Sequence, residues 1–195
     1  MIDAGYAAVG KSLGLPCHAY LGATDSKLVD AQAGYESGMT ALIGGLAGID
    51  MISGPGMLDF LLAQSPEKLV IDAEMIGMVQ RLLRGIGTPT ETLATASFEA
   101  VGPEGWFLGL PETRRLFRGE QFLPSRIIDR GSRRAWLDAG GQDAFARARV
   151  RVDEIIAGPR LPELAPAVSA ALTARVREAG APFGLAEVLP GVPAA

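Results

Sequence analysis

Residues 17–36 read CHAYLGATDSKLVDAQAGYE, and this stretch decides the fold class. Its first five residues form a short apolar run that is typical of a buried strand, and Gly22 ends that run. From Asp25 to residue 47 the apolar side chains recur at a spacing of three or four, which predicts a helix with Asp25 as its N-cap. A strand, a glycine turn and a helix in this order indicate a βα unit.

The following residues repeat that order. Residues 49–52 are apolar except for Asp50, and Ser53-Gly54-Pro55-Gly56 is a strong turn signal, after which we expect a short apolar helix over residues 57–62. Ser65, Pro66 and Glu67 then mark the start of a longer helix, because Ser caps well, Pro suits the first position and an acid suits the first turn. The two units together predict a parallel sheet.

Helices are also expected elsewhere in the chain. The patterns predict them over residues 1–13, 90–100, 132–157 and 165–178, with an irregular segment over 106–129. Residues 182–195 are expected to form a loose or docked terminus.

Composition excludes several classes of protein. The chain has 195 residues, 48% of them hydrophobic, and a net charge of −4, which argues against binding nucleic acid mainly through phosphate contacts. One Cys and one His exclude a disulfide framework and disfavour a closed zinc site, so we expect no metal ligands. No signal peptide or bilayer-length apolar stretch is apparent, so we expect a cytoplasmic protein without a membrane interaction.

The residues after the first strand are the main candidates for chemistry. Acids, an amide and a cation gather there, at the strand end that faces the active site in parallel α/β folds. They are Asp25, Lys27, Asp30, Gln32 and Glu36. The commoner explanation of such a pattern is a capped helix with a solvated polar face, and that alternative stays open on the pattern alone.

Three other features carry weaker signals. Ser53 and Gly54 could lie against a ligand, although a turn without a ligand is the simpler interpretation. Cys17 and His18 are neighbours on a strand and point to opposite faces, which disfavours a catalytic pair. The arginines between residues 114 and 134 suggest a docking face for another protein, or ion pairs with Glu112, Glu120 and Asp129.

Short motifs follow one another in a fixed order along the chain. They are Gly22-Ala23-Thr24-Asp25-Ser26-Lys27, Asp30-x-Gln32-Ala33-Gly34-Tyr35-Glu36, Ala47-Gly48-Ile49-Asp50, Ser53-Gly54, Ser65-Pro66-Glu67-Lys68-Leu69-Val70-Ile71-Asp72-Ala73-Glu74, Arg84-Gly85-Ile86, Val101-Gly102-Pro103, Trp106-Phe107-Leu108, Phe117-Arg118-x-Glu120, Pro124, Asp129-Arg130 and Trp136. This series resembles the trimethylamine methyltransferase (MttB) family over roughly residues 14–162. Each motif alone is weak, whereas their order is specific.

The resemblance implies a (β/α)8 barrel that moves a methyl group from a methylated amine to the cobalt of a corrinoid (cobalamin) carried by a separate protein. No cofactor is then expected to bind this chain directly. Trimethylamine-specific members carry pyrrolysine, which this sequence lacks, so the resemblance favours a non-pyrrolysine relative. The methyl donor that the resemblance implies is a methylated amine, either trimethylamine or a quaternary amine such as glycine betaine. Asp25 and Glu36 are our candidate catalytic residues. The candidate substrate-binding residues are Lys27, Gln32, Tyr35, Ser53, Gly54 and Trp106.

Two departures from the family bear on function. Glu112 and Leu116 stand where the family usually shows histidines. Family members are also more than twice as long, so we expect the C-terminal portion of a barrel over residues 1–162, followed by a C-terminal helix and a Pro/Ala-rich tail over residues 163–195. Such a portion exposes sheet edges, which favours a homo-oligomer or a partner chain that supplies the N-terminal half of the barrel. The alternatives are an inactive barrel remnant that only binds a partner chain, and an unrelated small α/β binding domain.

Overall fold

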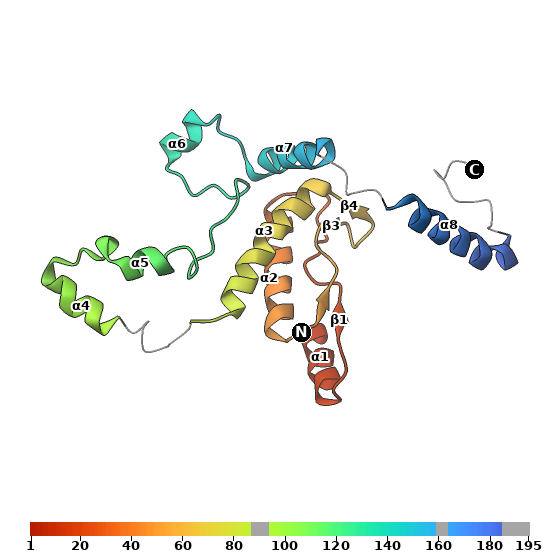
Figure 1. Ribbon diagram of the computed structural model, residues 1–195, viewed down its shortest axis with the longest axis horizontal. Coiled ribbons are helices and arrows are strands. Elements are labelled where there is room, and N and C mark those ends of the chain that lie inside the picture. Colours follow the sequence, from red (N-terminus) through yellow and green to blue (C-terminus); the bar gives the residue numbers. More distant parts are fainter. Residues whose placement is uncertain (87–93, 159–163, 185–195) are drawn as a thin grey trace. The chain divides into compact units, whose positions relative to one another are not determined.

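The first helix, α1 (Ile2–Ser12), leads into a two-stranded parallel sheet. The computed structural model describes residues 1–86, 94–158 and 164–184 (Figure 1). Strand β1 (His18–Ala19) pairs with β2 (Met51–Ile52), with His18 opposite Met51 and Ala19 opposite Ile52. The predicted α1 and the predicted parallel pairing are therefore confirmed, and the mixture of helices and strands fits the α/β class.

Helix α2 (Ala31–Leu46) connects the two strands and begins later than the sequence pattern predicts. Its N-cap is Asp30, whose Oδ1 accepts a hydrogen bond from the Ala33 amide at 3.1 Å, so the prediction of Asp25 as the cap is wrong. The six residues from Asp25 to Asp30 stay outside the helix because Ser26 Oγ donates to Asp30 Oδ1 and to the Leu28 carbonyl. Such local side-chain hydrogen bonds compete with helix formation.

An antiparallel hairpin replaces the short helix expected over residues 57–62, so that prediction is wrong. Strands β3 (Met57–Leu58) and β4 (Ala63–Gln64) pair with Met57 opposite Gln64. At the tip, Asp59, Phe60 and Leu61 have φ of 49°, 54° and 71°, a left-handed conformation that such residues rarely adopt. Tertiary contacts hold it, since the Asp59 amide donates to the Ser26 carbonyl at 3.0 Å.

Helix α3 (Pro66–Leu83) begins as predicted. Ser65 Oγ accepts a hydrogen bond from the Lys68 amide at 3.1 Å, which confirms the cap. Helices α2 and α3 lie side by side (Figure 1). A β-carbon at Gly45 of α2 would lie only 2.8 Å from Leu83 Cδ1, so the absence of a side chain allows this close packing.

Small side chains form the core between α1 and one face of the parallel sheet. Ala7, Cys17, Ala19 and Ile49 are buried together there. The opposite face of the sheet carries His18, Tyr20 and Met51, which are exposed. This sheet therefore has only one covered face within the part of the chain that the structure describes.

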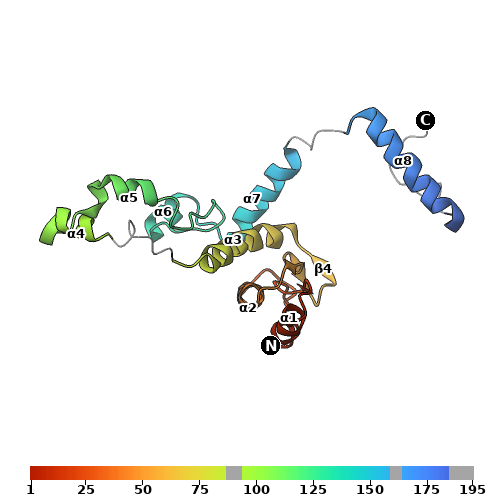
Figure 2. The same cartoon turned by 60° about the horizontal axis from the view of Figure 1, so that its bottom comes forward.

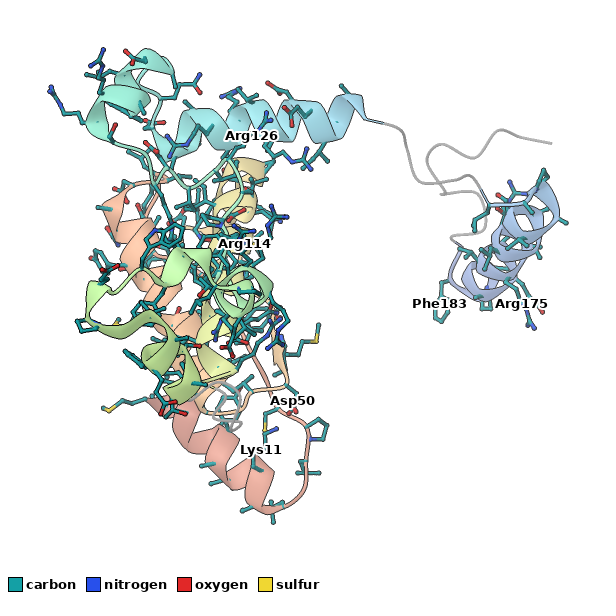
Figure 3. The ribbon with its side chains drawn as sticks, turned by 60° about the vertical axis from the view of Figure 1, so that its left-hand side comes forward. Lys11, Asp50, Arg114, Arg126, Arg175 and Phe183 are labelled. Atoms are coloured by element: carbon teal, nitrogen blue, oxygen red, sulfur yellow. The ribbon has the colours of Figure 1, made fainter. Side chains whose placement is uncertain are left out.

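An ion pair joins α1 to the residue that precedes β2. Lys11 Nζ lies 2.8 Å from both carboxylate oxygens of Asp50, and Figure 3 shows the two side chains pointing toward one another. Asp50 Oδ2 also accepts a hydrogen bond from the Cys17 amide at 2.8 Å. Both contacts hold the pKa of the Asp50 carboxyl below its ordinary value, the Lys11 hydrogen bond more strongly.

Short helices follow residue 93. They are α4 (Thr95–Val101), η2 (Gly102–Glu104), η3 (Phe107–Gly109), α5 (Pro111–Leu116), α6 (Arg133–Asp138) and α7 (Ala144–Ala157). The single helix predicted over residues 132–157 is wrong, because Gly140 and Gly141 have φ of 97° and 64° and separate α6 from α7. Helix α7 returns to α3, where Arg149 Nη1 lies 3.9 Å from Glu67 Oε1 (Figure 2). Residues 90–93 of the expected helix over 90–100 lie outside the described residues.

The chain divides into two compact units, residues 1–156 and 157–195. The second contains α8 (Pro166–Gly180), which confirms the helix predicted near residues 165–178, and η4 (Ala181–Phe183). The predicted boundary after residue 162 and most of the predicted tail lie outside the described residues. None of the described helices is long and apolar enough to cross a membrane.

Candidate functional site

A cavity of about 340 Å³ opens where strand β1 ends. Three parts of the chain form its walls, namely β1 with its following loop, helix α2 and the tip of the β3–β4 hairpin. The lining residues are Tyr20, Leu21, Ala23, Thr24, Asp25, Glu36, Thr40, Phe60 and Leu61. The cavity thus lies at the carboxyl end of a parallel strand, where α/β proteins place their ligands.

Glu36 connects two of these walls. Its Oε2 accepts hydrogen bonds from Thr24 Oγ1 at 2.5 Å and from the Asp25 amide at 3.0 Å, and its Oε1 accepts from Gln32 Nε2 at 3.0 Å. These bonds, the one from Thr24 foremost, hold the pKa of Glu36 below its ordinary value. Glu36 is therefore a fixed anion at neutral pH.

The lining of the cavity suits a cation that carries apolar substituents. Asp25 and Glu36 supply negative charge, and the described residues of the lining include no Lys or Arg. Tyr20 and Phe60 supply aromatic faces, which attract quaternary ammonium groups. A small methylated amine satisfies both features.

Lys27 joins the hairpin to the loop beside the cavity. Its Nζ donates to the Asp25 carbonyl at 2.7 Å and lies 3.1 Å from Asp59 Oδ1. The same ammonium lies 5.0 Å from the centre of the Phe60 ring. Lys27 thus helps to hold the strained tip in place and is not itself a lining residue.

Ser53 and Gly54 lie on the neighbouring loop, after β2. Ser53 Oγ is hydrogen-bonded to His18 Nε2 at 2.6 Å. Gly54 is buried, and its amide donates to the Leu21 carbonyl at 3.1 Å. A β-carbon at Gly54 would lie 2.5 Å from that carbonyl oxygen, so this glycine permits the approach of one backbone to another.

The structure does not bring the remaining candidates to the cavity. Tyr35, on α2, and Trp106, just before η3, are exposed and are not among the lining residues. Glu112, on α5, accepts a hydrogen bond from Ser97 Oγ at 2.8 Å, and Leu116 ends the same helix. Glu120 forms an ion pair with Arg81, whose Nη2 lies 3.4 Å from Glu120 Oε2. Arg81 is not one of the arginines between residues 114 and 134 that were expected to pair with it.

Sequence reasoning missed seven lining residues, which come from the segment after β1, from α2 and from the hairpin. They are Tyr20, Leu21, Ala23, Thr24, Thr40, Phe60 and Leu61. Tyr20 and Thr24 lie between β1 and the candidate residue Asp25, and this position in the sequence could have indicated them. Phe60 and Leu61 could not, because residues 57–62 carry the apolar pattern of a helix.

Among residues 1–86, 94–158 and 164–184, no three His, Cys, Asp or Glu side chains are arranged to hold a metal ion.

Comparison with known proteins identifies the protein family. The family model for trimethylamine methyltransferase matches residues 1–182. The chain belongs to the trimethylamine methyltransferase family. Trimethylamine methyltransferase MttB2 of Methanosarcina mazei is 37% identical over 164 residues, which cover 83% of this chain and 32% of that relative.

Two bacterial proteins are also similar to this chain. Trimethylamine methyltransferase MttB of Desulfitobacterium hafniense is 32% identical over 97% of this chain and 38% of its own length. A glycine betaine methyltransferase of the same species is 33% identical over 91% of this chain and 37% of its own length. This member of the trimethylamine methyltransferase family thus spans about a third of the length of its curated relatives.

Proposed function

We propose that this chain forms part of a methyltransferase that removes a methyl group from a methylated amine, either trimethylamine or a quaternary amine such as glycine betaine. Family membership supports the reaction class. The acidic and aromatic cavity after β1 supports the substrate class, and it is the observation that carries the proposal. Glycine betaine methyltransferase among the relatives shows that the family includes an enzyme named for a quaternary amine.

The residues of the chain would bind and orient the cation. Asp25 and Glu36 attract the ammonium, while Tyr20 and Phe60 contact its methyl groups. The methyl carbon–nitrogen bond breaks, its electron pair stays on nitrogen, and the amine leaves neutral. A quaternary donor therefore needs no proton from the protein.

The acceptor in this proposal is the cobalt(I) of a corrinoid that a separate protein carries, which supplies the nucleophile. We further propose that residues 1–162 correspond to the C-terminal portion of a (β/α)8 barrel. The exposed face of the β1–β2 sheet supports this, because parallel sheets are normally covered on both faces. Strands that cover it would come from another segment or another chain.

One experiment tests the reaction. The chain, alone and with an N-terminal barrel half from a relative, is mixed with a cobalt(I) corrinoid protein and a panel of methylated amines. Methyl-cobalt absorbance with one donor supports the proposal, and loss of the signal in Asp25→Ala and Glu36→Ala variants assigns it to this cavity. No signal with any donor, even with the barrel half supplied, contradicts the proposal and leaves a chain that only binds a partner.

A further inference from the structure

Helix α3 carries a buried ion pair that the proposed chemistry does not use. Lys68 and Asp72, one turn apart on α3, are 1% and 3% exposed. Lys68 Nζ lies 2.5 Å from Asp72 Oδ2. Neither residue lines the cavity after β1. Burying two charges is unfavourable unless both are paired and hydrogen-bonded, so this pair requires an explanation.

The hydrogen bonds of the pair reach all three walls of the cavity. Lys68 Nζ donates to the Gly22 carbonyl at 3.3 Å, in the loop after β1, and to Ser37 Oγ at 2.8 Å, next to Glu36 on α2. Asp72 Oδ2 accepts a hydrogen bond from the Gly56 amide at 2.7 Å, at the base of the hairpin. The three donor hydrogens of the ammonium are thereby used.

We infer that Lys68 and Asp72 are the positioning residues of the cation cavity. This inference rests on the proposed function of that cavity. Neither residue touches the cavity. They act by fixing the loop after β1, helix α2 and the hairpin relative to one another, which sets the separation of Asp25, Glu36 and Phe60. A site held by buried, hydrogen-bonded groups keeps its geometry without a ligand.

Two amides report on that geometry directly. The Asp25 amide donates to Glu36 Oε2 at 3.0 Å, between the loop and α2, and the Thr24 amide donates to the Met57 carbonyl at 3.3 Å, between the loop and the hairpin. Neither hydrogen bond involves Lys68 or Asp72. Their hydrogen-exchange rates therefore measure the relative position of the walls.

The test compares the full chain with Lys68→Met, with the double variant Lys68→Met/Asp72→Leu and with Ala7→Gly. The double variant leaves no unpaired buried charge, so it keeps the test available if Lys68→Met alone does not fold. Ala7, on α1, is fully buried in the core and does not line the cavity, so Ala7→Gly destabilises the fold without removing a hydrogen bond between the walls. The readouts are tetramethylammonium affinity by NMR titration and exchange at the two amides.

The expected result for the double variant is at least a tenfold loss of tetramethylammonium affinity, with at least tenfold faster exchange at both amides. Ala7→Gly is expected to keep the wild-type values of both. If exchange accelerates in the double variant but the wild type binds no tetramethylammonium, the positioning role stands and the cation assignment fails. Three results would overturn the inference. In the first, the wild type binds tetramethylammonium and the double variant binds it equally well. In the others, amide exchange is unchanged in the double variant, or it accelerates equally in Ala7→Gly.

Discussion

Thr24 Oγ1 donates a hydrogen bond to Glu36 Oε2 over 2.5 Å and so joins the loop after β1 to helix α2. The contact fixes one carboxylate oxygen of Glu36 at the cavity wall. The Asp25 amide and Gln32 Nε2 complete the hydrogen bonds of this carboxylate. A carboxylate held in this way keeps both its place and its charge, and the next two predictions follow from that.

Replacing Glu36 with Gln is expected to weaken tetramethylammonium binding about tenfold, because the variant keeps the shape of the side chain and removes its charge. Isothermal titration at neutral pH provides the measurement. The matched control is Glu67→Gln, an acid on α3 that pairs with Arg149 and does not line the cavity. Equal losses of affinity in both variants would show a general charge effect.

The ionisation of Glu36 is expected to resist acid. Its folded-state pKa is lowered from the ordinary 4.5, mainly by Thr24, so its contribution to stability is present above 4.5 and is lost as pH falls through the lower folded value. Thr24→Val removes the main cause and should move the titration midpoint of Glu36 upward, toward 4.5. NMR titration of the Glu36 side-chain carboxyl carbon separates it from Asp25 in the same cavity, and an unmoved midpoint contradicts the assignment.

Phe60 is expected to contribute to binding through its ring. Phe60→Leu should lower tetramethylammonium affinity roughly two- to fivefold, because an exposed cation–π contact contributes about 0.5–1 kcal/mol. The comparison is Phe98→Leu, an exposed ring that packs edge-on against Phe107. Isothermal titration calorimetry measures the affinity of both variants. A wild-type affinity in Phe60→Leu would show that the Phe60 ring does not contribute to binding.

Two glycine substitutions are expected to change stability in opposite directions. Gly54→Ala would place its β-carbon 2.5 Å from the Leu21 carbonyl oxygen, so we expect a loss of about 1–3 kcal/mol in the free energy of unfolding. Gly34→Ala, on α2 with no atom within 4 Å of the new carbon, should gain roughly 0.5–1 kcal/mol from helix propensity. Urea denaturation followed by circular dichroism measures both, and a neutral Gly54→Ala would contradict the close approach of the two loops.

The purified chain is expected to associate. Tyr20 and Met51 lie on the exposed face of the parallel sheet, and its strand edges offer unpaired backbone groups to a neighbour. Light scattering after size-exclusion chromatography should show species larger than 20.4 kDa. A sharp monomer peak with cooperative unfolding would contradict this expectation.

The helices and the parallel pairing could be predicted where local signals agree with the fold. Ser65 and Pro66 fixed the start of α3 because capping depends on neighbouring residues alone. The hairpin could not be predicted, because left-handed Phe60 and Leu61 carry no glycine signal and are held by tertiary contacts. The early start expected for α2 failed for a related reason, since Ser26 redirects the chain through side-chain hydrogen bonds.

The candidate site could be predicted in part for the same reasons. Asp25 and Glu36 follow one strand in sequence, so the pattern brought them together, and the structure places both at one cavity. Their roles in catalysis stay predictions. Lys68 gave no signal, because a lysine on an amphipathic helix is normally solvated and its burial depends on the acceptors on α2 and the loop after β1.

The cavity is encoded by one uninterrupted piece of the chain. All of its lining residues fall within residues 20–61, and the buried pair adds only Lys68 and Asp72 on the next helix. Residues 18–72 therefore contain both the cavity walls and the buried pair that we infer aligns them, whereas α1, which covers one face of the sheet, lies outside this segment.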